Sequence, residues 1–339
     1  MISRNQRINA FVNLGEYLKD PTHSIELEEI KAAARNTNSW FVPDNSQLAL
    51  DSITDTFLQA SALGEFLNQY PETGVSKKIG VVMAGNVPAV GFHDALSVIL
   101  SGHHLLAKLS KDDTPLMHFL LSTLIKVEPA LRDSITFVDK INAADAYIAT
   151  GSDNTARYFN FYFSSKPHII RKNRTSVGVL TGNESTEELR GLVKDILLYF
   201  GLGCRSVSKL YVPEGYDFTG LFESAEEMRD HYANHHKYFN NYEYNKSILL
   251  VNRTEHLDNG FLIITRNESL VSPLSVVYHE PYQSLESLKQ ALSKQEEKIQ
   301  CVVGNTDSTL ATIPFGAAQQ PSLRDFADGV DTMKFLSEL

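Results

Sequence analysis

Residues 200–212 read Phe200-Gly-Leu-Gly-Cys204-Arg-Ser-Val-Ser-Lys-Leu-Tyr-Val212 and place a thiol between a helix and a strand. Upstream, apolar residues recur at helical spacing and form one stripe on a predicted helix: Leu189, Leu192, Val193, Ile196, Leu197 and Phe200. Ser185 and Glu188 fit a capping box at its start, and Gly201 is a natural stop. Residues 207–212 predict a strand ending at Pro213. Cys204 therefore lies in a turn that a substrate can reach.

The alternative for Cys204 is a buried, inert thiol, which is the commoner fate of a single cysteine. The chain has two cysteines, far apart in sequence, and Cys301 lies in a run typical of a strand core. Two isolated cysteines favour a reducing cytoplasm without a disulfide framework. The remaining sequence has to decide between the two interpretations of Cys204.

Composition excludes several classes of protein. The chain has 339 residues, of which 42% are hydrophobic, so it can form a large core and favours two lobes over one. The formal net charge of −10 argues against a general binder of nucleic acid or of membrane surfaces. Charges recur from Arg4 onward, so no signal-peptide core is expected, and no apolar run approaches a membrane span.

The first half alternates between strand and helix patterns after an N-terminal helical region that covers residues 1–75. Short buried strands are expected at residues 79–83, 105–109, 135–138, 146–149 and 168–171, with helices between them. This alternation predicts an open parallel sheet with helices on both faces. Ligands in such sheets bind beyond the carboxyl ends of the strands. Three loops lie at such ends: Gly85-Asn86, Leu109-Ser110-Lys111 and Gly151-Ser152.

The second half shows a similar α/β alternation. Strands are expected at residues 177–180, 247–251, 261–265, 274–278 and 300–303, and a helix at residues 285–292. The predicted architecture is therefore two α/β lobes. A nucleotide-binding lobe with the N-terminal helices covers residues 1–175, a catalytic lobe with Cys204 covers 176–318, and a C-terminal segment covers 319–339. We expect Cys204 to lie near the cleft between the lobes.

Five segments in this order resemble the aldehyde dehydrogenase superfamily, and within it the LuxC-type acyl-CoA reductases. The segments are Ala84-Gly85-Asn86-Val87-Pro88, Leu105-Leu106-Ala107-Lys108-Leu109-Ser110, Ala149-Thr150-Gly151-Ser152, Phe200-Gly-Leu-Gly-Cys204 and Ile313-Pro314-Phe315-Gly316. The resemblance implies that Asn86 is the active-site asparagine and Cys204 the nucleophile. It also implies that Lys108 contacts the adenosine ribose and that Gly151 and Ser152 lie beside the cofactor pyrophosphate.

One departure from the family pattern bears on the direction of the reaction. Aldehyde-oxidising members carry Glu-Leu-Gly-Gly-Lys upstream of the cysteine, and that glutamate activates water. Here the corresponding region, residues 169–175, reads Ile-Ile-Arg-Lys-Asn-Arg-Thr and contains no carboxylate. Hydrolysis of an acyl-enzyme needs such a base, whereas hydride delivery does not. The departure favours reduction of an acyl thioester, although a base from Glu268 or Glu280 stays an alternative.

The resemblance therefore implies NAD(P)H-dependent reduction of an acyl-CoA or acyl-carrier thioester to an aldehyde through an S-acyl-Cys204 intermediate. Asn86 and the Cys204 N–H would hold the oxyanion. Ser110 and Lys111 lie where a 2′-phosphate would be met, which favours NADPH, with NADH possible. The alternatives for these residues are a turn role for Asn86 and a solvated charge for Lys111. Ser152 would cap a helix or bind phosphate.

Three other functions stay open: an aldehyde-oxidising dehydrogenase, an acyltransferase or thioesterase that uses Cys204 without hydride transfer, and a catalytically silent subunit. A homodimer and an acyl-transferring partner enzyme are compatible with the resemblance. His231, His235 and His236 have the spacing of metal ligands but lack a further ligand, so no metal site is predicted. The aromatic block at residues 158–163 is interpreted as core packing, with a wall for an acyl chain as the alternative.

Overall fold

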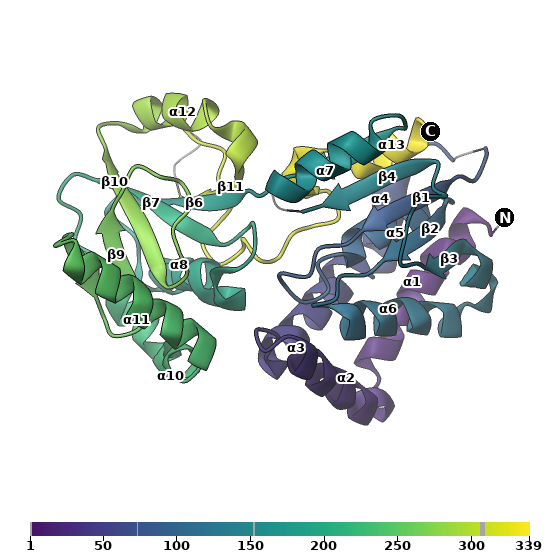
Figure 1. Cartoon of the computed structure of the whole chain (residues 1–339), viewed down its shortest axis with the longest axis horizontal. Helices are drawn as coiled ribbons and strands as arrows, with labels where there is room; N and C mark the ends of the chain where they lie inside the picture. The colour runs from purple at the N-terminus through teal and green to yellow at the C-terminus, as the bar shows by residue number, and fades with distance from the viewer. Residues whose placement is uncertain (1, 73, 152, 306–308) are drawn as a thin grey trace. The chain divides into compact units, whose positions relative to one another are not determined.

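The computed structural model describes residues 2–72, 74–151, 153–305 and 309–339 (Figure 1). The chain forms two compact units. The first contains residues 1–173 and returns to include residues 321–339, and the second contains residues 174–320. Each unit has its own β-sheet. The α/β class expected from the sequence is confirmed.

The sheet of the first unit has five parallel strands in the order β3-β2-β1-β4-β5. The strands are β1 (Lys78–Val82), β2 (His104–Lys108), β3 (Ile135–Phe137), β4 (Ala146–Thr150) and β5 (His168–Arg171). All five strands expected in this half are present. Their short apolar runs are buried on both faces of the sheet, as parallel strands require.

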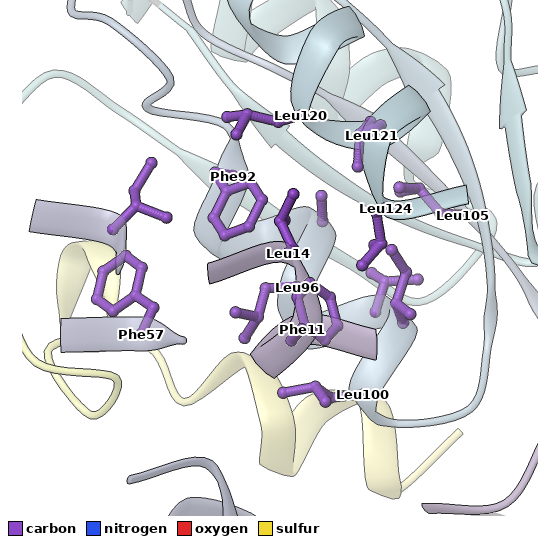
Figure 2. Close-up of a cluster of buried hydrophobic side chains, with 14 of the residues drawn as sticks. Phe11, Leu14, Phe57, Phe92, Leu96, Leu100, Leu105, Leu120, Leu121 and Leu124 are labelled. Carbon is purple, nitrogen blue, oxygen red and sulfur yellow. The ribbon is translucent and has the colours of Figure 1, made fainter. Parts of the chain in front are cut away.

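Helices cover both faces of this sheet. The larger core lies between the sheet and helices α1, α5 and α6, and its cluster of buried side chains includes Phe11, Phe92, Leu105 and Leu120 (Figure 2). On the other face, Tyr147 of β4 stacks on Phe163 of α7. The helices of this unit are α1 (Arg4–Lys19), α2 (Ser24–Thr37), α3 (Pro43–Ser52), α4 (Ala60–Leu67), α5 (Phe92–Leu100), α6 (Thr114–Val127), α7 (Asp153–Phe163) and α13 (Thr332–Ser337).

The C-terminal segment packs back onto the first unit. Leu323, Phe326 and Leu336 join the core around α5. The buried guanidinium of Arg171, at the end of β5, donates to Asp94 of α5 at 2.5 Å and to Thr332 of α13 at 2.8 Å. Because a buried charge needs a partner, the ion pair with Asp94 and the hydrogen bond to Thr332 connect β5, α5 and α13.

The second unit has a six-stranded sheet in the order β11-β6-β7-β10-β9-β8. Its strands are β6 (Thr175–Val179), β7 (Val207–Pro213), β8 (His256–Asp258), β9 (Ile263–Arg266), β10 (Val276–Tyr282) and β11 (Ile299–Gly304), all parallel except β8. On one face Leu210 packs near Gly178 and Leu192 of α8. On the other, Tyr211 packs with Leu288 of α12. The strand expected around Cys301 is β11.

The second unit contains helices α8 (Thr186–Leu197), α9 (Thr219–Ala225), α10 (Arg229–Ala233), α11 (His236–Val251) and α12 (Leu285–Ser293). The strand predicted at residues 247–251 is wrong, because these residues form the last turns of α11. A short apolar run cannot by itself distinguish a strand from a helix. None of the described helices combines the length and the apolar character that crossing a membrane requires.

Candidate active site

The segment before Cys204 leaves the helix earlier than the sequence indicates. The capping box of Ser185 and Glu188 is present, but α8 ends at Leu197 and a 3₁₀ turn follows at Leu198–Gly201. Tyr199 and Phe200 both adopt left-handed conformations, with φ of 54° and 57°. Such conformations cost energy for residues other than glycine and persist only where the surroundings impose them.

Aromatic packing imposes this bend. The Phe200 ring is 1% exposed and lies 4.3 Å from the His235 ring and 5.3 Å from the Tyr232 ring, measured between centroids. The Tyr232 hydroxyl donates to the Leu197 carbonyl at 2.8 Å and so satisfies one of the carbonyls at the end of α8. His231 and His235 therefore serve as packing partners of Phe200. No group of three or more metal-ligating side chains occurs among the described residues.

Cys204 itself is half-buried and lies in a tight turn. The Ser206 N–H donates to the Gly203 carbonyl at 3.0 Å, so Cys204 and Arg205 are the two central residues of a β-turn. The Ser206 hydroxyl accepts from the Gly203 N–H at 3.2 Å. From the neighbouring strand β6, the Ser176 hydroxyl donates to the Cys204 carbonyl at 3.0 Å. These hydrogen bonds fix the backbone that presents the thiol.

The second cysteine lies close to the same hydroxyl. Cys301 is buried in β11, and its Sγ is 3.0 Å from Ser176 Oγ, which also accepts from the Cys301 N–H at 3.2 Å. The prediction that Cys301 is a strand core residue is confirmed. Of the two cysteines, Cys204 is the more exposed, because Cys301 is buried.

Asn86 is an exposed residue in the loop after β1. Two contacts fix that loop against the segment after β2. A Cβ on Gly85 would lie 2.4 Å from Ser110 Oγ, so only glycine permits this approach. The Ala89 N–H donates to the buried carboxyl of Asp113 at 2.9 Å, and Ala89 has a φ of 54°. Asn86 belongs to the first unit and Cys204 to the second, so their pairing around an oxyanion stays a prediction.

Lys108 ends β2 and is half-buried, and Ser110 and Lys111 follow it in the loop before α6. The Ser110 hydroxyl accepts from the Asp112 N–H at 3.3 Å, and Lys111 is exposed. Gly151 follows β4, and its N–H donates to the Arg171 carbonyl at 3.3 Å. Ser152 lies outside the described residues.

The strand order brings these loops to one place. The chain proceeds from β1 outward through β2 and β3, then crosses to the opposite side of β1 with β4. The carboxyl ends of β1 and β4 therefore flank a topological switch point, where open α/β sheets bind their ligands. Gly151 and the first turn of α7 lie at this point. A helix start offers N–H groups to a phosphate, so the arrangement fits a dinucleotide.

The region that would hold a water-activating glutamate contains no carboxylate. Arg171 there is committed to Asp94 and Thr332. Glu268 and Glu280 are the two alternative bases, and Glu280 takes part in an ion pair. Glu280 of β10 pairs with Lys209 of β7, whose ammonium is fully buried and also donates to the Glu268 carbonyl at 2.7 Å. The Glu280 side chain is 39% exposed, so its carboxylate meets both the buried ammonium and solvent.

Two residues that brace the candidate turns were not identified from the sequence. Asp113 holds the Ala89 N–H after the Asn86 turn, and Asp195 of α8 accepts from the Gly316 and Ala318 N–H groups. The available signal was a charged residue at the margin of an apolar stripe, since Asp195 directly precedes Ile196. The aromatic block also differs from expectation, because Tyr158, Phe161 and Tyr162 are 66–78% exposed rather than packed in the core.

Comparisons with known proteins agree with the fold described above. The family described as acyl-CoA reductase (LuxC) matches residues 45–309. A search of curated proteins gave no match. Among solved structures, aldehyde dehydrogenase 21 from Physcomitrella patens superposes with a TM-score of 0.70 at 11% identity, covering 99% of this chain and 84% of that one. An NAD-dependent aldehyde dehydrogenase from Sinorhizobium meliloti gives 0.67 at 12% identity, covering 91% and 72%. At these identities the likeness establishes the fold.

Proposed function

The chain belongs to the LuxC acyl-CoA reductase family, and we propose that it reduces an acyl thioester to an aldehyde through an S-acyl intermediate on Cys204. The observation that carries the proposal is a half-buried cysteine at the centre of a braced β-turn. The family match makes an aldehyde-forming or aldehyde-consuming oxidoreductase the class of enzyme. The thioester substrate and the direction of the reaction belong to the proposal.

In the first step the Cys204 thiolate attacks the carbonyl carbon of an acyl-CoA or acyl-carrier thioester. A bond forms between Cys204 Sγ and the acyl carbon, the bond to the carrier sulfur breaks, and the carrier leaves as a thiol after taking a proton. The Asn86 amide and the Cys204 N–H donate to the oxyanion. One such preset donor lowers the barrier by about 2.7–4 kcal/mol.

A reduced nicotinamide, when bound, would supply the hydride that releases the acyl group as an aldehyde. Lys108 would contact the ribose, and Gly151 with the start of α7 would face the pyrophosphate. Ser152 is assigned the same role from the family pattern. Ser110 and Lys111 follow Lys108 directly, so a 2′-phosphate would meet a hydroxyl and an ammonium, which favours NADPH over NADH. Cys204 leaves the collapsing adduct as a thiolate, ready for the next substrate.

The absence of a carboxylate at residues 169–175 supports reduction over oxidation. An oxidising enzyme must hydrolyse its acyl-cysteine and needs a base for the attacking water. Glu280 pairs with Lys209, whose ammonium is fully buried, so using Glu280 as that base would take the carboxylate partner away from a buried charge. Glu268 stays an alternative base. The acyl chain length, a homodimer and an acyl-transferring partner enzyme are left to experiment.

The proposal is tested with wild type and Cys204→Ala, a panel of acyl-CoA esters and NADPH. We expect wild type to consume NADPH and to carry an acyl mass on the Cys204 peptide, with the Cys301 peptide as an internal control. Cys204→Ala should do neither. Consumption of NADPH that is unchanged by Cys204→Ala would overturn the mechanism.

The same assay separates the alternatives. Faster turnover of an aldehyde with oxidised cofactor than of acyl-CoA with NADPH would identify an aldehyde-oxidising enzyme. Thioester cleavage that needs no cofactor would identify an acyltransferase or thioesterase. A wild-type protein without any acyl adduct would identify a catalytically silent subunit.

A further inference from the structure

The segment at residues 314–319 lies directly on helix α8, within the second unit. A Cβ on Gly191 of α8 would come within 2.8 Å of the carbonyl carbon and oxygen of Phe315. Gly316 adopts a φ of +88°, which favours glycine. The segment and the helix therefore touch backbone to backbone, and both glycines are needed for that approach.

The carboxylate of Asp195 fastens the segment to the helix. One carboxylate oxygen accepts from the Gly316 N–H at 2.7 Å and the other from the Ala318 N–H at 3.0 Å. Asp195 is 0% exposed, although it is a charged residue. A buried carboxylate is costly unless it is hydrogen-bonded, so the two N–H groups account for its place in the fold.

The same segment also holds the turn that carries Cys204. The Arg205 Nε–H donates to the Ala318 carbonyl, so the Ala318 residue is bound by Asp195 through its N–H and by Arg205 through its carbonyl. The Gln319 amide donates at 3.2 Å to the Ser206 hydroxyl, which in turn accepts from the Gly203 N–H. The path from α8 to the nucleophile turn is continuous.

We propose that Asp195 is a positioning residue for Cys204, acting through the 314–319 segment and its hydrogen bonds to Arg205 and Ser206. The carboxylate does not touch substrate. It fixes the segment, and the segment fixes two of the four residues of the β-turn. The part of this inference that concerns turnover rests on the proposed function, whereas the part that concerns the geometry of the turn does not.

Asp195→Asn is the sharpest variant because it keeps the shape of the side chain. An amide presents one oxygen and one NH₂ group, so one of the two backbone N–H groups would face a donor instead of an acceptor. The 314–319 segment should then be held less firmly against α8. Leu192→Ala is the matched control, since Leu192 is a buried α8 residue whose side chain packs toward Leu210 on the sheet.

The experiment measures alkylation of Cys204 by iodoacetamide in the full-length protein, followed by mass spectrometry of the Cys204 peptide. We expect Asp195→Asn to change the alkylation rate about fivefold or more, because one charge-assisted hydrogen bond no longer holds the segment. In turnover, kcat should fall while KM for the thioester stays near wild type, as expected when an interaction acts in the transition state. Leu192→Ala should lower stability and leave the alkylation rate of the folded protein near wild type.

Wild-type alkylation of Asp195→Asn, or an equal change in Leu192→Ala, would refute the positioning role. If Asp195→Asn does not fold, Gln319→Ala removes only the bond to Ser206, and a wild-type alkylation rate there would count against the proposal in the same way. Alkylation does not require thioester reduction. A wild type that fails to reduce any thioester would therefore refute the proposed function while the alkylation result still decides the role of Asp195.

Discussion

The turn that carries Asn86 and the turn that carries Cys204 are each braced by a buried aspartate, but the two aspartates are hydrogen-bonded differently. In the first unit, Asp113 accepts one backbone N–H, from Ala89, and its other oxygen has no partner among the described residues. In the second unit, both oxygens of Asp195 accept backbone N–H groups, and Arg205 lies close enough to act on the carboxylate. Both side chains are 0% exposed.

The two carboxyls should therefore differ in charge. Burial raises the pKa of Asp113 well above its usual range, and a single N–H from Ala89 opposes this only in part. Burial also raises the pKa of Asp195, but the two N–H groups and the positive charge of Arg205 limit the rise to about 6. Asp113 should therefore be protonated and neutral near neutral pH, whereas the Asp195 carboxyl next to the nucleophile changes its protonation state just below neutral pH.

The largest expected effect comes from Asn86 itself. Replacing Asn86 by Ala or by Asp removes the amide donor, and we expect kcat to fall about 10²–10³-fold, the usual effect of losing one oxyanion donor. Asp keeps the size of the side chain and so controls for the turn. Steady-state rates with acyl-CoA and NADPH measure the effect. Activity that survives in Asn86→Asp would mean that Asn86 serves the turn alone.

Replacing Asp113 by Asn and by Ala should have different effects on the free energy of unfolding. Asp113→Asn keeps an acceptor for the Ala89 N–H and should be tolerated. Asp113→Ala leaves that buried N–H unsatisfied and should cost about 1–3 kcal/mol in the free energy of unfolding. Urea titration of the two variants measures the difference. Equal destabilisation by Asn and Ala would show that the carboxyl is held ionised.

The pH dependence of stability provides a check on the same residue. The pKa of Asp113 is higher in the folded than in the unfolded chain, so the folded state gains from the proton at low pH. That stability is fully present below the unfolded pKa and is lost as pH rises through the folded pKa. Asp113→Asn removes this loss, so it should be more stable relative to wild type at pH 8 than at pH 4.

Asp195 should make the Cys204 turn pH-sensitive, with a smaller effect. The ionised carboxylate accepts both N–H groups, and protonation below about pH 6 weakens one of these bonds. Arg205 is the charged group that acts on it. The ratio of Cys204 alkylation rates in wild type and Asp195→Asn should change severalfold between pH 5 and pH 7. A ratio that stays constant over this range would show that the ionisation of Asp195 does not affect the Cys204 turn.

Much of the fold follows from local sequence patterns. The strands of the first sheet are short apolar runs bounded by turns, and the capping box of Ser185 and Glu188 begins α8 where the sequence indicates. The residues after α8 do not follow from such patterns. The left-handed conformations of Tyr199 and Phe200 depend on packing against Tyr232 and His235, which no local propensity contains.

The candidate site divides in the same way. Cys204 and the loops at the strand ends were identified because each motif is continuous in sequence. The braces were not, because each joins distant segments: Asp195 and Gly316 are 121 residues apart, and Ser176 and Cys204 are 28 apart. A hydrogen bond between remote backbone and side-chain groups leaves no periodic signal, so only the folded chain reveals it.

The smallest expected effect compares two helical glycines. Gly64 lies in α4 with open space around the position of a Cβ, whereas a Cβ on Gly191 of α8 would press on the Phe315 backbone at 2.8 Å. Gly64→Ala should stabilise the protein by up to about 1 kcal/mol, the usual gain for Ala over Gly inside a helix. Gly191→Ala gains the same helix propensity but overpacks the 314–319 segment at a cost of about 1–3 kcal/mol, so it should be neutral to destabilising.

Thermal unfolding measures both variants, and the Cys204 alkylation rate should change only in Gly191→Ala, because only that residue touches the segment that braces the turn. If Gly191→Ala proves as stabilising as Gly64→Ala, the segment does not rest on α8, and the link from Asp195 to Cys204 fails with it.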